Sequence, residues 1–280
     1  MLAVRIATYN LKNLFLAGEG PAKAAAEMRP LVRMLAQVDA DVMVLQEVGS
    51  LASLTELNQR LAQPYAHSGL LPGNTDRSIH LAVLSRYPLR LVSHRHSVLL
   101  DEQQRPLQEY PSEQAALDGA LAPLRFARDL LRIDVQGLAY PLSLFAVHLK
   151  SRTNRPWRAL AADEVRAAES RMVSELVTRF RKDHPEALVF LCGDFNHRLT
   201  SDALAPIAAL GLCDPLGALL KVSGRNPSTY WPKRRMRIDH ILVCESGAAR
   251  IVPDSAQIHA NRMAQTASDH YPVSVELDLV

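Results

Sequence analysis

The sequence predicts an α/β sandwich, and two observations support this class. Segments rich in β-forming residues alternate with helical segments along most of the chain, which is typical of α/β proteins. Several of the expected strands nevertheless follow one another with no helix between them. This mixture favours a sandwich over a simple doubly wound sheet.

The expected strands are short apolar runs, and the expected helices repeat apolar residues every three or four positions. In chain order we expect a strand at 4–10, helices at 22–37 and 50–62 on either side of a strand at 41–48, strands at 79–86, 130–135 and 142–148, a helix at 157–182, and strands at 187–194, 237–243 and 271–279. Residues 101–124 are rich in Gln, Glu, Pro and Ala. They predict an insertion or a long loop with some helix, in the position of a lid.

The composition is that of a globular protein with a mild positive charge. The chain has 280 residues, of which 48% are hydrophobic, enough for a sizeable core in one large domain or two. The net charge is +3 and the pI about 8.8, a small bias toward anionic partners. The 32 basic residues are 26 Arg and 6 Lys. Arginine suits bidentate contacts to phosphate, although a compositional bias of the genome would give the same excess.

The cysteines and the N-terminus indicate a cellular location. Cys192, Cys213 and Cys244 are odd in number and match no zinc-binding spacing, so we expect reduced core residues in a cytoplasmic protein. The first ten residues, MLAVRIATYN, lack the charged start and apolar stretch of a signal peptide. No apolar run is long enough to cross a bilayer, so no membrane segment is expected. Export of a cleaved precursor stays open.

Polar side chains stand at the ends of several predicted strands. The strands at 4–10, 41–48, 142–148 and 187–194 carry Asn10, Glu47, His148 and Asp194 at or next to their last position. Asp239 lies within RIDHILV, and Asp269 and His270 precede the last strand. One such residue is usually a turn former, but strand ends gathered at one rim of a sheet make a site. We therefore expect these side chains to form one.

An ordered set of motifs carries a family resemblance. TYNLKNLF, LQEV, VLSRYP, AVHLKS, GDFN, RIDHIL and SDHYPV resemble, in this order, the motifs of the endonuclease/exonuclease/phosphatase family, from Asn10 to Val273. The family includes pancreatic deoxyribonuclease, abasic-site endonucleases, inositol polyphosphate 5-phosphatases and sphingomyelinases. The resemblance implies one domain over 1–280 with a four-layered α/β sandwich, two mixed sheets face to face with helices outside. It also implies cleavage of phosphoester bonds, usually with Mg²⁺.

The expected metal site contains oxygen donors. Magnesium is a hard cation that takes one or two carboxylates and keeps several waters, so Glu47 is the first candidate ligand. The resemblance gives Asn10 a role in holding the same ion or the carboxylate, and Asp269 a role as a further ligand or a structural support. Mn²⁺ and Ca²⁺ are alternative ions at such a site.

The expected proton acceptor is His270, oriented by Asp239. An imidazole titrates near neutral pH and can take a proton from water, while a carboxylate on its other nitrogen fixes the tautomer. Asp194 and Asn196 lie two positions apart in GDFN, so on an extended backbone they point the same way and could hold water and a phosphate oxygen. Phe195 would then point into the core, and Gly193 would let the backbone come close. His197 is expected to be an ordinary surface histidine.

His148 matches a position at which deoxyribonuclease-like members of the family carry a histidine. It could assist the leaving group or hold a phosphate oxygen. In those members an upstream acid usually pairs with this histidine, but the corresponding position here is His80. Either Asp76 replaces that acid, or His148 is not oriented in the usual way.

Basic residues flank the strand ends that are expected to form the site. Arg128 matches a phosphate-contacting arginine of the nuclease members. The others form two groups, the first Lys150, Arg152, Arg155 and Arg158, the second Lys233, Arg234, Arg235 and Arg237. We expect phosphate contacts from Arg128, Lys150, Arg152 and Arg237. Such contacts could follow a polyanionic backbone, and Trp157 and Trp231 could stack on a base.

Together these features predict a metal-dependent phosphodiesterase that acts on nucleic acid, with no protein partner implied. One alternative is a phosphatase or phosphodiesterase for a small or lipid-headgroup substrate. The sequence shows no hydrophobic hairpin for docking on a membrane. Another alternative is an inactive nucleic-acid-binding module, but binding alone would not require a base and the carboxylate that orients it.

Overall fold

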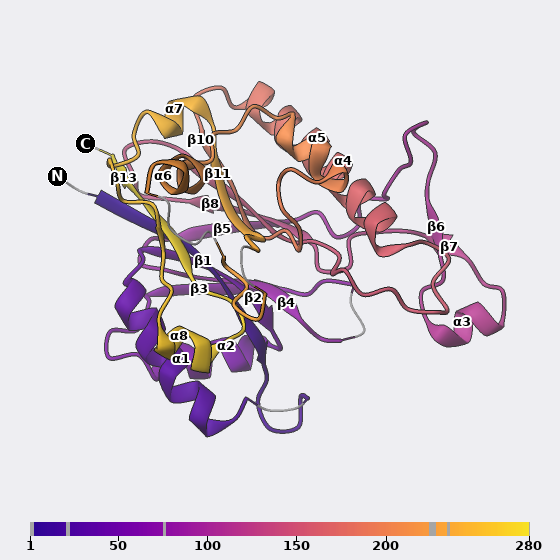
Figure 1. The fold of residues 1–280 in the computed structure, drawn as a ribbon, viewed down its shortest axis with the longest axis horizontal. Helices are drawn as coiled ribbons and strands as arrows, with labels where there is room; N and C mark the ends of the chain where they lie inside the picture. The colour runs from indigo at the N-terminus through magenta and orange to yellow at the C-terminus, as the bar shows by residue number, and fades with distance from the viewer. Residues whose placement is uncertain (1–2, 21–22, 75–76, 224–227, 234–235, 280) are drawn as a thin grey trace.

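The computed structural model describes residues 3–20, 23–74, 77–223, 228–233 and 236–279. Two β-sheets lie face to face, with the main groups of helices on the outer sides (Figure 1). Both sheets mix parallel and antiparallel neighbours. The α/β sandwich with two mixed sheets is therefore confirmed.

The first sheet has six strands in the order β12-β13-β1-β2-β4-β3. Its members are β1 (Ala3–Leu14), β2 (Val42–Val48), β3 (His67–Leu71), β4 (His80–Ser85), β12 (Gln257–Ile258) and β13 (Val273–Asp278). β1 and β2 are parallel, so their carboxyl ends lie at the same edge of the sheet. Asn10 is paired with Gln46 in this register, so Asn10 and Glu47 lie close to each other at that edge.

The second sheet has five strands in the order β11-β10-β9-β8-β5. Its members are β5 (Leu89–Ser93), β8 (Leu130–Val135), β9 (Leu142–His148), β10 (Leu188–Asp194) and β11 (Asp239–Val243). β9 and β10 are parallel and are connected through the longest helix. This crossover places the last residues of both strands, His148 and Asp194, side by side.

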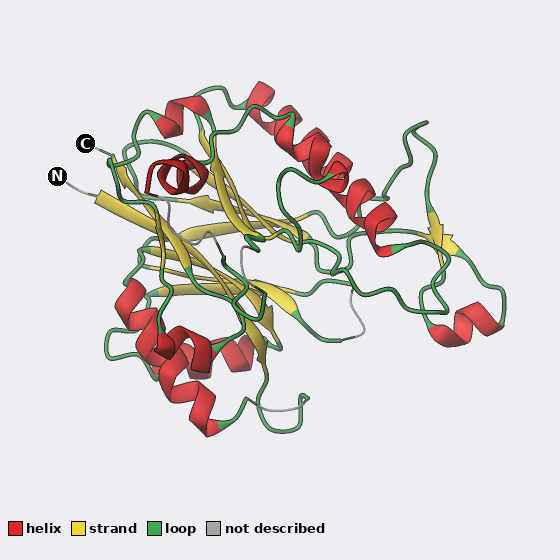
Figure 2. Cartoon of the chain, viewed as in Figure 1, coloured by secondary structure: helices red, strands yellow, loops and turns green. Residues whose placement is uncertain are grey.

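Helices cover the outer faces of both sheets (Figure 2). The first sheet packs against α1 (Ala25–Val38), α2 (Leu51–Gln59) and α8 (Arg262–Ala267), and the second against α4 (Ala162–Asp183) with the short η1 (Asp202–Leu204) and α5 (Ala205–Ala208). α6 (Pro215–Ser223) and α7 (Glu245–Ala248) contact β11 and β10. None of the helices in the described ranges is both long and apolar enough to span a membrane.

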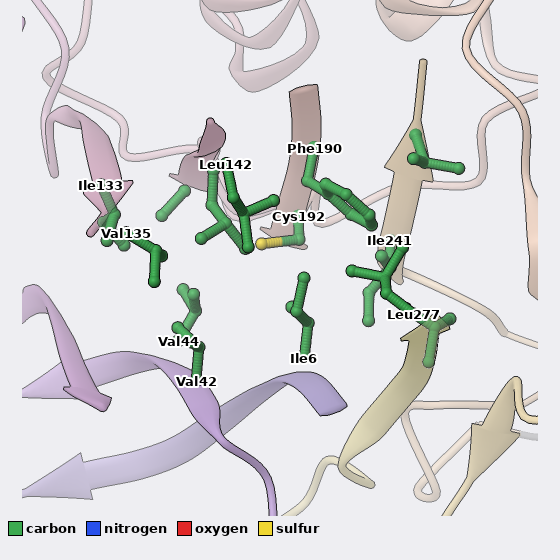
Figure 3. Close-up of a cluster of buried hydrophobic side chains, with 14 of the residues drawn as sticks. Ile6, Val42, Val44, Ile133, Val135, Leu142, Phe190, Cys192, Ile241 and Leu277 are labelled. Atoms are coloured by element: carbon green, nitrogen blue, oxygen red, sulfur yellow. The ribbon is translucent and has the colours of Figure 1, made fainter. Parts of the chain in front are cut away.

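The central core lies between the two sheets. Figure 3 shows Ile6, Val42 and Val44 of the first sheet facing Leu142 and Phe190 of the second. The next residues along these strands point the other way and are buried under the helices. Strands that are buried on both faces have continuous apolar sequences, and these strands could therefore be predicted from the sequence. Each fully buried aliphatic side chain contributes about 1.5–3 kcal/mol relative to an exposed one.

Residues 101–124 project from the sandwich as an arm. They contain a two-stranded ribbon of β6 (Gln108–Glu109) and β7 (Ala122–Pro123), with α3 (Glu113–Leu117) between the strands (Figure 1). Glu109 is 2% exposed and accepts hydrogen bonds from the backbone N–H groups of Ala159 and Leu160. The arm is thereby tied to the segment that precedes α4.

The structure differs from the expected elements mainly at boundaries and edges. The helix expected at 157–182 begins at Ala162, where Glu164 accepts from the N–H of Ala161. The strands β3 and β5 were not expected, because as edge strands they are only half-buried and lack a strong apolar pattern. Arg234, Arg235 and Asp76 lie outside the described residues.

Candidate active site

Three adjacent strands of the second sheet place polar side chains at one edge. Asp194 pairs with His148 across the parallel β10 and β9, and with Asp239 across the antiparallel β10 and β11. The register therefore fixes the three residues in a row. They are 1%, 3% and 0% exposed, respectively, so their polar groups interact in a medium that screens charge poorly.

The first sheet contributes Asn10 and Glu47 to the same centre. Asn10 Nδ2 donates to Asp194 Oδ2 at 3.0 Å and lies 3.4 Å from Glu47 Oε1, so its amide links the two sheets. The side-chain oxygen of Asn10, Oδ1, accepts from the N–H of Lys12. Asn10 therefore contacts both carboxylates.

Glu47 has a left-handed backbone conformation, with φ 62°. This conformation costs a non-glycine residue roughly 1–2 kcal/mol. It occurs at a register irregularity of β2 between Leu45 and Val48, and such bulges re-aim a side chain. Glu47 Oε2 accepts from the N–H of Asn13 at 3.0 Å, and Oε1 lies 3.9 Å from His148 Nε2. The bulge thus directs the carboxylate into the centre.

Asp194 and Asn196 come together through a turn. The expectation of an extended backbone was wrong, because β10 ends at Asp194 and Asn196 has φ 55°. The N–H of Asn196 donates to Asp194 Oδ1 at 2.8 Å, and Nδ2 donates to the carbonyl of Leu149 at 2.9 Å. Gly193 has φ 136°, and a Cβ there would lie 2.0 Å from the carbonyl oxygen of Val147, so the close approach of the backbone is confirmed. Phe195 is fully buried, as expected.

His270 and Asp239 form a close pair. His270 Nδ1 donates to Asp239 Oδ2 at 2.9 Å, and Nε2 lies 3.9 Å from Asp194 Oδ2. Burial alone would lower the pKa of His270, but the charges of Asp239 and Asp194 outweigh it and raise this pKa to about 10. Burial raises the pKa of Asp194 to about 7, against the opposing effect of His270. The expected base and its orienting carboxylate therefore meet through the fold.

His148 lies in the same centre but has a different environment. Its Nε2 is 3.6 Å from Asp194 Oδ2, whereas its buried Nδ1 has no hydrogen-bond partner among the described residues. Burial, with the charges of Arg128 and His270, lowers the pKa of His148 well below its usual value. His80 accepts from the N–H of Gly73 instead. Among the described residues, no acidic side chain forms a hydrogen bond with Nδ1 of His148.

The centre offers ligands that suit a divalent cation. Ligand atoms of Asp194, Asp239 and His270 all lie within 4.8 Å of one another, and all three side chains are buried. Together with Glu47 they form an oxygen-rich donor set, which fits a hard cation. Asp269 stands at the rim, half-buried, with Ser268 Oγ 3.5 Å from Oδ1. Its charge still helps to raise the pKa of His270.

Two of the four expected phosphate-binding residues line a pocket next to the centre. Arg128 and Lys150 line it together, and Arg128 Nη1 donates to the carbonyl of Leu149. Burial and the charge of Arg128 lower the pKa of Lys150 to about 8. Arg152 Nη1 lies 3.9 Å from the sulfur of Met236. Arg237 forms a two-point ion pair with Asp214, which occupies its guanidinium group.

The two tryptophans differ in whether their rings are available to a ligand at the centre. Trp157 lies against the guanidinium groups of Arg158 and Arg155, 4.7 and 5.6 Å from the ring centre. Trp231 is 40% exposed, and its Nε1–H donates to the carbonyl of Ser268, directly before Asp269. An aromatic face at the rim of the centre therefore belongs to Trp231.

Sequence reasoning missed three residues that support the centre. Glu169 is 1% exposed and accepts from the N–H of Lys150 at 2.6 Å. Ser268 Oγ donates to the carbonyl of Asn10 and accepts from the N–H of His270. The ring of Tyr230 packs edge-on against His270, with the ring centres 5.2 Å apart. Only Glu169 left a signal, a carboxylate on the apolar face of a predicted helix.

Comparison with solved structures finds the same fold in proteins of low sequence identity. The human Nocturnin catalytic domain has a TM-score of 0.65 at 16% identity, with 99% of this chain and 95% of that chain covered. The D. rerio TDP2 solved with a single-strand DNA product has a TM-score of 0.61 at 20% identity, with 99% of each chain covered. Sphingomyelinase C from Streptomyces griseocarneus has a TM-score of 0.61 at 17% identity, with 99% of this chain and 100% of that chain covered.

Comparison with curated proteins finds no match. A family model, described as the Endonuclease/Exonuclease/phosphatase family, matches residues 7–270 and so includes every candidate residue of the centre. The structural likeness covers almost the whole chain as well. This chain therefore belongs to the endonuclease/exonuclease/phosphatase family.

Proposed function

We propose that this protein is a magnesium-dependent phosphodiesterase that hydrolyses nucleic acid. One observation carries the proposal. His270 is paired with Asp239 at 2.9 Å and faces Asp194 in a buried centre that also contains Glu47 and His148. Hydrolysis of a phosphodiester by water requires a general base, a carboxylate that orients it and a cation beside them, and this arrangement offers groups for all three.

Each residue has a role in this reaction. The raised pKa of His270 keeps its ring protonated at neutral pH in the metal-free centre, and a cation bound beside Asp194 would lower that pKa. The neutral ring would then take a proton from the attacking water, and Asp239 would stabilise the imidazolium that forms. Asn196 lies against Asp194 and can orient the same water or a phosphate oxygen with its amide. His148 is the neutral imidazole that contacts a phosphoryl oxygen or the leaving oxygen through Nε2. Asn10 keeps Glu47 and Asp194 in position.

The proposed cation ligand is Glu47, with Asn10 beside it and Asp269 near the rim. A cation bound instead at the cluster of Asp194, Asp239 and His270 would occupy the ring of His270 and exclude it as the base. When bound, Mg²⁺ would neutralise charge on the phosphoryl oxygens and on the surrounding carboxylates. Mn²⁺ and Ca²⁺ are the alternatives to test, because they accept the same hard oxygen ligands.

Nucleic acid as the substrate is supported by charge and by an aromatic surface. Arg128 and Lys150 lie beside the centre, and the exposed Trp231 stands at its rim, where it can stack on a base. A similar structure, TDP2 from D. rerio, was solved with a single-strand DNA product. The cytoplasmic location predicted from the unpaired cysteines is also part of this proposal.

The test uses the purified protein with plasmid, single-stranded DNA, RNA and bis-p-nitrophenyl phosphate. We expect cleavage of a nucleic acid with Mg²⁺, loss of cleavage with a chelator, and loss in a His270→Ala variant prepared in parallel. Hydrolysis of bis-p-nitrophenyl phosphate or of inositol phosphates without cleavage of nucleic acid would replace this proposal by a phosphodiesterase or phosphatase for small or headgroup substrates. No turnover of any phosphoester would leave an inactive binding module.

A further inference from the structure

The end of β1 contains a strained bulge beside the catalytic centre. The register of β1 with β2 is irregular between Asn10 and Leu14. Within this stretch Lys12 and Asn13 both have left-handed backbones, with φ 52° and 58°. Two consecutive residues other than glycine rarely adopt this conformation, and such strain persists only where the surrounding structure holds it. The bulge therefore needs contacts that keep it in place.

The two N–H groups of the bulge hold side chains of the centre. The N–H of Lys12 donates to Asn10 Oδ1 at 3.0 Å, and the N–H of Asn13 donates to Glu47 Oε2 at 3.0 Å. Glu47 is the proposed cation ligand, and Asn10 contacts it. The directions of these two N–H groups therefore help to set where the carboxylate of Glu47 lies.

Lys23 holds the opposite ends of the same two peptide groups. Its Nζ donates to the carbonyl oxygen of Leu11 at 2.8 Å and to that of Lys12 at 3.3 Å. The carbonyl of Leu11 and the N–H of Lys12 belong to one peptide group, and the carbonyl of Lys12 and the N–H of Asn13 belong to the next. Because a peptide group is planar and trans, its C=O and N–H point in opposite directions. A contact that fixes the carbonyl therefore also fixes the N–H.

The environment of Lys23 is unusual for a lysine. The residue is 9% exposed, and no ion pair of Lys23 is found in the described part of the chain. The nearby Glu27 pairs with Lys12 instead, at 3.5 Å. Lysine is rarely buried without a charged partner, because burial disfavours its ammonium group. A role for the two carbonyl contacts accounts for this placement.

We propose that Lys23 is a positioning residue for the cation site. Its ammonium group orients two peptide groups, and their N–H groups in turn orient Asn10 and Glu47. The hydrogen bonds at the carbonyl ends also polarise these peptide groups and make their N–H groups stronger donors. The inference rests on the proposed function, because it takes Glu47 as the ligand. It adds that a residue with no contact to the cation controls how tightly the cation binds.

The experiment measures Mg²⁺ binding by calorimetric titration of the chelator-treated protein, which needs no turnover. Lys23→Met removes the donors with little change in length, and we expect the Kd for Mg²⁺ to rise about 10- to 100-fold, the usual effect of losing a group that orients a metal ligand. Lys23→Arg keeps N–H donors and should bind Mg²⁺ more tightly than Lys23→Met. Lys182→Met makes the same change of charge at an exposed position of α4 and should bind like the wild type.

Two further measurements separate positioning from general stability and from the proposed function. Leu35→Ala removes a buried side chain of α1, the helix that follows Lys23, and should lower stability to urea with the Kd for Mg²⁺ unchanged. With bis-p-nitrophenyl phosphate, Lys23→Met should need at least tenfold more Mg²⁺ for half its maximal rate but reach a similar kcat. Hydrolysis by the wild type but not by His270→Ala upholds the phosphodiesterase, whatever the Mg²⁺ titrations show.

The same Kd for Mg²⁺ in Lys23→Met and in the wild type would overturn the inference. Tighter binding by Lys23→Met would also overturn it, because Lys23 would then act on the cation as a repelling charge. An equal loss of affinity in Leu35→Ala would assign the effect to the stability of α1 rather than to the bulge. Absence of Mg²⁺ binding by the wild type would remove the cation site on which the inference depends.

Discussion

Two histidines of the same centre differ in what their second ring nitrogen contacts. His270 and His148 both direct Nε2 toward Asp194 Oδ2, at 3.9 and 3.6 Å. Nδ1 of His270 donates to Asp239, whereas the buried Nδ1 of His148 has no partner among the described residues. The pKa of the first is raised to about 10, and that of the second is lowered well below its usual value.

The contrast shows that a partner on the far nitrogen decides which ring can carry charge. Both rings are buried, so desolvation acts on both in the same direction and lowers both pKa values. Only His270 also has a carboxylate in hydrogen-bonding contact, Asp239 at 2.9 Å, and this contact with the charges of Asp239 and Asp194 reverses the effect of burial. His270 is therefore suited to carry positive charge, and His148 to remain a neutral hydrogen-bonding group.

The largest expected effect comes from removing the charged pair. His270→Ala should lower kcat on bis-p-nitrophenyl phosphate by about 10²–10⁴-fold, the usual contribution of general acid–base catalysis. Asp239→Asn should cause a loss of similar size, because the amide no longer stabilises the imidazolium or fixes its tautomer. Steady-state kinetics measure both. Near-normal rates for either variant, with the fold intact by circular dichroism, would contradict the catalytic role of the pair of His270 and Asp239.

The pH dependence of stability should have opposite signs for the two rings. The folded-state pKa of His270 is raised, so its contribution to stability is complete below about 6.5, the value for an unfolded chain, and is lost as the pH rises through about 10. The folded-state pKa of His148 is lowered, so the unfolded state binds more protons and His148 lowers stability as the pH falls below about 6.5.

Urea unfolding of the chelator-treated protein from pH 5 to pH 10 measures these contributions. His270→Gln should lose less stability than the wild type between pH 7 and 10. His148→Gln should lose less between pH 7 and 5. The difference between each variant and the wild type removes the contribution of the other titrating groups. The same slope for both variants would contradict the assignment of opposite shifts.

A smaller effect is expected from removing His148. Its loss should lower kcat about fivefold, since one net hydrogen bond contributes about 1 kcal/mol. His148→Asn, which keeps an N–H donor, should recover part of the rate, and this recovery distinguishes a neutral donor from a proton carrier. If His148→Ala were as inactive as His270→Ala, the two rings would act as an acid–base pair despite their different partners.

Much of this centre could be predicted from the sequence, because strand ends are easy to locate. Strands buried on both faces are continuous apolar runs, and the polar residues that end them mark one edge of each sheet. The meeting of Asp239 with His270, 31 positions apart, followed from the motif order and the resemblance rather than from spacing. Their contact at 2.9 Å bears out that expectation.

Other features depend on tertiary contacts that leave no local pattern. Asn196 reaches Asp194 through a left-handed turn rather than an extended strand, and asparagine is one of the few residues that tolerate that turn. Arg237 looks like a phosphate contact in the sequence, but Asp214, 23 positions earlier, pairs with it. The missing partner of His148 could be suspected from His80, yet only the structure shows His80 turned toward Gly73.

The smallest expected effect tests how the active ring is held. The ring of Tyr230 packs edge-on against His270, with ring centres 5.2 Å apart and planes at 61°, and no such ring contact is found for His148 among the described residues. An aromatic pair contributes about 0.5–1.5 kcal/mol, so Tyr230→Leu should lower kcat by about two- to tenfold. Tyr230→Phe keeps the ring and should retain nearly the full rate. Equal losses in both variants would assign the effect to the hydroxyl group, and His270 would then be held by Asp239 and Ser268 alone.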